Sequence, residues 1–147
     1  MIINLRFVFL QKKRMNNRSN DLIQIRPEIK KTLSFKKTSK IELFQNTTLR
    51  PILKLQNLLL IEAFRNYINI HKGVFYNLGI DNRLNYIENA LLKNQKFQNS
   101  IKGMIIGHFT IEEYQSFNQD YSELNKRIMS LVIGRLKDQE QLFKKNP

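Results

Sequence analysis

The segment LRPILKLQNLLLIEAFRNYINIH, residues 49–71, repeats apolar side chains every three or four positions. This spacing gathers side chains on one face of an α-helix. The residues that form the face are Leu49, Ile52, Leu53, Leu59, Leu60, Phe64, Tyr67 and Ile68. A helix with so wide an apolar face usually lies at the centre of a fold. The pattern predicts a central helix that starts at a Thr47 or Thr48 N-cap and ends at Gly73.

Other helix starts are marked by capping residues. Ser39 is followed three residues later by Glu42, which fits the capping-box pattern. Thr110 and Glu113 have the same spacing, and Asp120 is suited to cap one more helix. We therefore expect helices to begin at each of these positions.

Apolar spacing predicts two further helices, over residues 80–94 and 95–108. The alternation typical of strands is not sustained anywhere after residue 40. The expected fold is all-α, with residues 41–147 forming a single domain, an irregular bundle of five or six helices.

The charge of the chain is concentrated at its start. The net charge is +13, and residues 1–40 hold eleven of the 25 Lys and Arg but only two of the 12 acidic residues. Asn, Ser, Lys and Thr dominate residues 15–40, and Pro27 blocks a long helix there. We expect residues 1–40 to be a basic, mostly unstructured arm, with a short ordered piece near residues 22–29.

The first fourteen residues are apolar and β-like, and Met15 offers a second start. We interpret residues 1–14 as an over-extended gene start. They lack the order of charges and the cleavage site of a signal peptide, and no apolar run in the chain is long enough to cross a membrane. The expected location is cytoplasmic.

The stretch KGMIIGHFTIEEY, residues 102–114, holds the candidate site residues. Gly103 and Gly107 share a helix face, which favours close packing against another helix or the approach of a ligand. His108 and Glu112 are candidate catalytic residues, and both would join His71 as candidate metal ligands. Their spacing fits no established metal template.

The absence of cysteine excludes disulfides, zinc–thiolate sites and thiol nucleophiles.

Five runs along the chain carry a resemblance to a known family. They are QIRPEI, LFQNTTLRPILKLQN, YIENA, KGMIIGHFTIEEY and LNKRIMSLVIGRLKDQ. The chain resembles a family of small, uncharacterised bacterial helical proteins whose members often carry the label glyoxalase. The resemblance implies this label more than a mechanism, and it assigns no catalytic residue.

The sequence contains no phosphate-binding loop, dinucleotide-binding fingerprint or nucleophile elbow. No cofactor is evident. The leading hypothesis is a binding module that recognises a protein partner, itself or a small ligand between its helices. One alternative is a glyoxalase-like metal enzyme that uses His108. The other is a protein that associates with nucleic acid through its basic arm, whose candidate contacts are Lys12, Lys13, Arg14, Lys30, Lys31, Lys36 and Lys37.

Overall fold

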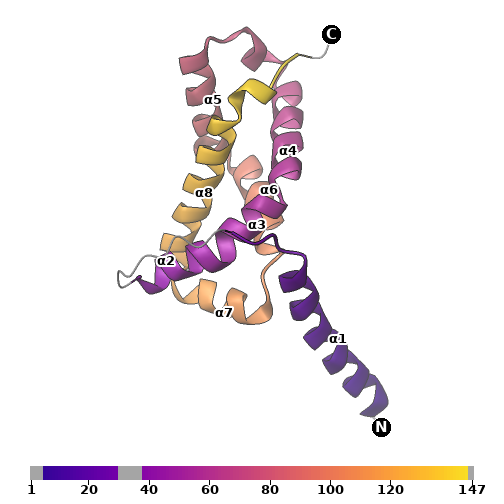
Figure 1. The fold of residues 1–147 in the computed structure, drawn as a ribbon. Coiled ribbons are helices and arrows are strands. Elements are labelled where there is room, and N and C mark those ends of the chain that lie inside the picture. The colour runs from indigo at the N-terminus through magenta and orange to yellow at the C-terminus, as the bar shows by residue number, and fades with distance from the viewer. Residues whose placement is uncertain (1–4, 30–37, 146–147) are drawn as a thin grey trace.

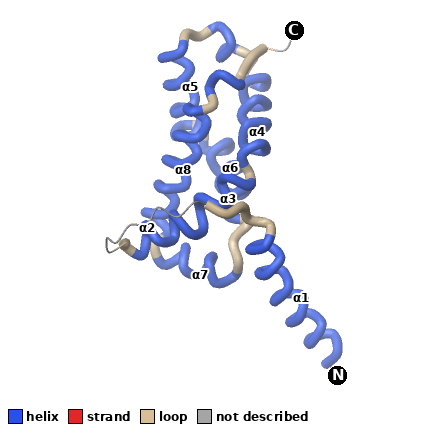
Figure 2. Tube along the Cα trace, viewed as in Figure 1, coloured by secondary structure: helices blue, strands red, loops and turns tan. Residues whose placement is uncertain are grey.

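The computed structural model describes residues 5–29 and 38–145. All regular structure in these residues is helical, as Figure 2 shows, and none of it is strand. The predicted all-α class is therefore confirmed. None of the described helices is long and apolar enough to cross a membrane.

From α2 onward the helices follow one another with short connections. They are α1 (Leu5–Gln24), α2 (Lys40–Phe44), a π-helix (Gln45–Leu49), α3 (Arg50–Leu55), α4 (Asn57–Ile70), a 3-10 helix (Val74–Asn77), α5 (Ile80–Lys93), α6 (Gln95–Ile106), α7 (Ile111–Gln119), α8 (Tyr121–Asp138) and a second 3-10 helix (Glu140–Leu142).

The predicted central helix differs from the observed one at its start. Neither Thr47 nor Thr48 caps it, because the chain is already helical from Lys40 and passes through the π-helix into α3. Pro51 lacks an N–H and crowds the carbonyl four residues before it. The π-helical turn directly before α3 accommodates that proline.

A second difference is the break at Gln56, which separates α3 from α4. Its ψ of 2° departs from the helical range. The Gln56 side chain leaves the helix surface and donates a hydrogen bond to the Met104 carbonyl on α6, at 2.9 Å. This tertiary bond lies at the point where α3 ends and α4 begins, so the predicted single helix is two helices. As predicted, Gly73 follows the end of α4, with a φ of 65° that suits glycine.

Aromatic rings fill the core between α4, α5, α6 and α8. Phe64 is fully buried at its centre, and its ring centroid lies 4.9 Å from that of Phe143 and 5.5 Å from that of Phe75. Tyr86 and Phe97 pack on other sides of the same ring. The apolar face of α4 is narrower than its sequence suggests, because Leu59 is exposed.

Helix α1 projects from one end of the bundle, with its N-terminal end farthest away (Figure 1). This corrects two expectations, because the β-like residues from Leu5 onward are helical, and so is half of the expected unstructured arm, Leu5–Gln24 of residues 1–40. The physical reason is that α1 contains no proline or glycine and is rich in residues that tolerate helix. The helix ends at Gln24, three residues before Pro27. Lys30, Lys31, Lys36 and Lys37 lie outside the described residues.

We predict that Phe64→Ala lowers the free energy of unfolding by about 4 kcal/mol, because it empties the site on which the other rings pack. Leu58→Ala is the control, since Leu58 on the same helix is 76% exposed. Its effect should stay below about 0.5 kcal/mol. Urea unfolding measures both, and equal effects would contradict this description of the core.

Candidate functional site

The corner between α6 and α7 is built on a capping box. The Thr110 hydroxyl accepts a hydrogen bond from the Glu113 amide at 3.1 Å, and the Glu113 carboxylate accepts one from the Thr110 amide at 2.8 Å. The predicted start of α7 is thereby confirmed. The reciprocal bonds satisfy two amides that a helix start leaves without partners.

Arg26 reaches this corner from the segment that follows α1. Its guanidinium group donates two hydrogen bonds to the Glu113 carboxylate, at 2.7 and 2.8 Å, and one to the His108 carbonyl at 2.7 Å. The side chains of Arg26 and Glu113 are only 8% and 18% exposed. The pair is therefore bidentate and largely shielded from water, a geometry in which charge-assisted hydrogen bonds are strong.

Thr48 completes the set of donors around Glu113. Its hydroxyl lies 2.6 Å from a carboxylate oxygen of Glu113 and donates to it. One carboxylate thus joins the π-helix, the N-terminus of α7 and the segment after α1. Both oxygens of Glu113 are used by these structural bonds, so this carboxylate is not free to act on a substrate.

Arg18 fastens α1 itself to the corner. It donates to the carbonyls of Phe109 and Gly107, at 2.9 and 3.0 Å. Carbonyls that follow the last turn of a helix have no partners within that helix, and the helix dipole makes this end attractive to cations. The backbone carbonyls at the end of α6 therefore accept hydrogen bonds from the guanidinium groups of both Arg18 and Arg26.

The environment of Glu113 determines its charge. Burial alone would raise its pKa, but hydrogen bonds from Arg26, the Thr110 amide and Thr48, together with the charge of Arg26, outweigh burial and hold the pKa below the ordinary value. Glu113 is therefore ionised at neutral pH, and its charge contributes to the stability of the folded state.

His108 sits at the same corner in a different environment. Burial, followed by the charges of Arg26 and Arg18, lowers its pKa. Its Nδ1 atom is buried and has no hydrogen-bond partner among the described residues. The ring is neutral at pH 7, as a metal ligand must be, but the two nearby guanidinium groups repel a cation.

The other candidate metal ligands are not assembled around His108. His71 follows α4, and its ring centroid lies 4.2 Å from that of Tyr67. Glu112 is exposed on α7. Within residues 5–29 and 38–145, no three His, Asp or Glu side chains are grouped so that they could hold a metal ion.

The two glycines of the stretch are not at a helix crossing. A Cβ atom on Gly103 would meet no other atom within 4 Å, so no neighbouring helix packs closely there and the close-packing prediction is wrong at this position. Gly107 lies at the C-cap of α6, where a Cβ atom would come within 3.0 Å of the Gly103 carbonyl. The carbonyl of Gly107 is the acceptor for Arg18, which is the use that the structure shows for this residue.

We predict that Glu113→Gln lowers the free energy of unfolding at pH 7 by about 2 kcal/mol, because it leaves the shielded Arg26 without its counter-ion. The effect should be pH-dependent. Since the folded-state pKa of Glu113 is lowered, its contribution is complete above the ordinary value of 4.5 and is lost as the pH falls through the folded-state pKa. The variant should therefore lose less stability on acidification than the wild type.

The control for this prediction is Glu112→Gln, which changes the same group at the adjacent exposed position. Its effect at pH 7 should be below about 0.5 kcal/mol. Urea unfolding at several pH values measures both variants. If the two substitutions had the same effect at every pH, the role assigned to the Arg26–Glu113 pair would be wrong.

We also predict that zinc, nickel or manganese does not raise the melting temperature of the full chain above its value in EDTA. A metal that binds only the folded state must raise it, and the charges of Arg18 and Arg26 oppose a cation at His108. A rise that His108→Ala abolished, with zinc for example, would contradict this and favour the metal-enzyme alternative.

Sequence reasoning identifies the cap at this corner but not the arginines and the threonine that complete it. Nothing local marks Arg18, Arg26 or Thr48, since each becomes significant only through a residue far away in the chain. The corner as a whole is a polar, extensively bonded junction that orients α1.

Comparisons of the chain with models of protein families, with curated proteins and with solved structures give no match.

Proposed function

We propose that this protein is an interaction module that binds an acidic protein partner through helix α1. The observation that supports this is the way α1 is held. Its C-terminal part is fastened to the corner by Arg18, and Arg26 continues the attachment just beyond it. The opposite end stands clear of the bundle (Figure 1).

The free end of α1 carries apolar side chains in water. Leu5 is 84% exposed and Val8 is 47% exposed. Most of the stability of a helix in a protein comes from packing of its apolar side chains, and Leu5 and Val8 are exposed. Packing these side chains in a groove of another protein would bury them and stabilise the helix, as in other complexes where a helix occupies a groove.

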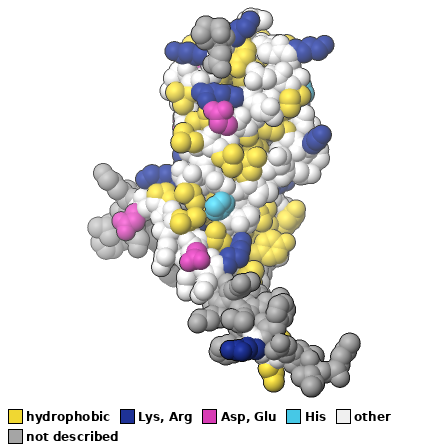
Figure 3. Space-filling view, turned by 90° about the vertical axis from the view of Figure 1, so that its right-hand side faces the viewer, with side chains coloured by type: hydrophobic (Ala, Val, Ile, Leu, Met, Phe, Trp, Pro, Cys, Tyr) yellow, Lys and Arg dark blue, Asp and Glu magenta, His cyan; other side chains and the backbone are white. Residues whose placement is uncertain are grey.

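The charge of α1 indicates which class of partner would bind it. The sequence of α1 includes Arg6, Lys12, Lys13 and Arg14 near its free end, and its one acidic residue is Asp21, toward the attached end. On the face of the molecule in Figure 3, Lys and Arg are spread widely and Asp and Glu are fewer. With a net charge of +13, two copies of this chain repel each other, whereas an acidic surface attracts it.

We predict that Leu5→Glu with Val8→Glu weakens binding of the partner at least tenfold, because the change places two negative charges on the proposed contact. Affinity capture from cells that make the protein identifies candidates. Binding is then measured by titration calorimetry with each purified candidate and the purified full chain. Leu58→Glu with Ile80→Glu is the control, since both residues are exposed on the bundle and the charge change is the same.

Two results would overturn the proposal. The first is a partner that binds the Leu5/Val8 variant as tightly as the wild type, which would place the contact elsewhere. The second is self-association. A dimer seen by sedimentation velocity in the wild type and lost in the Leu5/Val8 variant would make a second copy of the chain the occupant of α1.

A further inference from the structure

A basic groove lies at the end of the bundle opposite to α1. It is formed by the second half of α4, the 3-10 helix that follows it and the tail after the last 3-10 helix, and its volume is about 620 Å³. Figure 1 shows the C-terminus and the end of α4 together at this end, far from α1. The groove and α1 are therefore separate surfaces.

Positive charge dominates the groove. Lys72, Lys144 and Lys145 line it with Arg65, and among the described residues Glu62 is the only acidic one in its wall. Glu62 is already ion-paired with Arg65. The positive charges of the three lysines are therefore not balanced by any other carboxylate in the described part of the wall. This excess of positive charge attracts anions.

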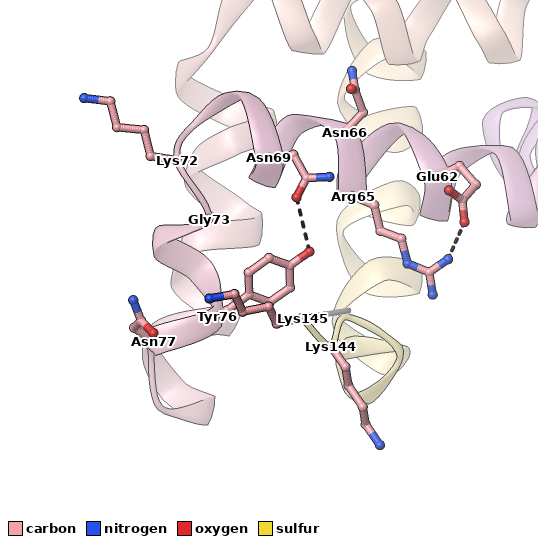
Figure 4. A pocket seen from close by; sticks show the side chains of 10 residues that line it. All are labelled: Glu62, Arg65, Asn66, Asn69, Lys72, Gly73, Tyr76, Asn77, Lys144 and Lys145. Atoms are coloured by element: carbon pink, nitrogen blue, oxygen red, sulfur yellow. Dashed lines mark hydrogen bonds and ion pairs between the residues drawn. The ribbon is translucent and has the colours of Figure 1, made fainter. Parts of the chain in front are cut away.

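Uncharged polar side chains occupy the space between the cations. Asn66, Asn69, Asn77 and Tyr76 all line the groove. In Figure 4 the Asn69 amide points toward the Tyr76 hydroxyl, 3.5 Å away. Amides both donate and accept hydrogen bonds, so they suit the edges of nucleobases, and an aromatic ring offers a surface for stacking.

The walls of the groove are fixed by bonds to the rest of the fold. Arg65 donates to the Leu142 carbonyl at 3.0 Å and ties the tail to α4. Arg83 donates to the Tyr76 carbonyl at 3.1 Å and to Glu140 at 2.8 Å, which joins the 3-10 helix to the C-terminal segment. The shape of the groove is thus set before any ligand binds.

The turn that carries Lys72 has an unusual backbone. Lys72 and Gly73 are consecutive residues with positive φ, 62° and 65°. Lysine rarely adopts this conformation. The turn brings Lys72 to the groove, and a Cβ atom on Gly73 would lie 3.3 Å from the Tyr76 ring, so glycine leaves the space that the ring needs.

We propose that this groove binds single-stranded nucleic acid. The lysines contact phosphates, while Asn69 and Tyr76 contact a base. A cavity of this volume lies within the range of small-ligand sites and suits a few nucleotides of one strand. Acidic peptides share the negative charge of nucleic acid but offer no bases to the amides and the ring.

The test uses the full chain and a fluorescein-labelled RNA of mixed sequence, about 20 nucleotides long, with binding followed by fluorescence anisotropy at several salt concentrations. Replacing Lys72, Lys144 and Lys145 by Gln should weaken binding at least tenfold. It should also reduce the slope of log K against log salt by about 2, since each phosphate contact with a single strand contributes about 0.7. Asn69→Ala should weaken binding without changing the slope.

The control replaces Lys93, Lys96 and Lys126 by Gln, which removes the same charge from exposed positions elsewhere. Its affinity should stay within threefold of the wild type. The Leu5→Glu/Val8→Glu variant should bind the RNA within the same threefold. That result separates a failure of this proposal from a failure of the proposal for α1.

Three outcomes would overturn the proposal. The first is competition by duplex DNA or polyglutamate as strong as that by unlabelled RNA, which would show that the groove does not select single strands. The second is an equal loss of affinity in the control variant and the groove variant. The third is binding that is abolished when Gln replaces Lys12, Lys13 and Arg14 but retained in the groove variant, which would place the site on the basic arm.

Discussion

The ion pair between Arg26 and Glu113 is the interaction that determines how the N-terminal part of the chain is arranged. Glu113 is in sequence a helix-capping residue, and in the structure its carboxylate also receives Arg26 and Thr48. Separating a shielded ion pair leaves a charge without its partner, and this is more costly than losing an exposed one. The direction of α1 relative to the bundle follows from this junction together with Arg18.

The two ends of the molecule use arginine in the same way. At one end Arg26 joins a carboxylate and a carbonyl, and at the other Arg83 joins Glu140 and two carbonyls. The planar guanidinium group has several donors in a fixed arrangement, so one side chain can connect segments distant in sequence. Between these junctions the aromatic cluster around Phe64 forms a rigid core. Arg26 and Arg83 thus have a structural use, while Lys72, Lys144 and Lys145 line the groove.

The parts of the structure that could be predicted from the sequence are those that depend on near neighbours. The cap formed by Thr110 and Glu113 spans three residues, and the apolar spacing of the main helices spans single turns. The break at Gln56 could not be predicted, because the bond that accompanies it goes to a carbonyl 48 residues away. The same holds for Arg26, which meets Glu113 across 87 residues. The helix at the start of the chain escapes prediction for another reason, since its apolar residues look β-like although the lack of proline and glycine allows a helix.

A double-mutant cycle on Arg26 and Glu113 tests the central claim most directly. The free energy of unfolding would be measured at pH 7 for the wild type, Arg26→Met, Glu113→Gln and the double variant. The structure predicts that the sum of the two single effects exceeds the effect of the double variant, with a coupling energy of about 2 kcal/mol. A coupling below about 0.5 kcal/mol would mean that the two residues contribute independently, and would contradict the structural role of their ion pair.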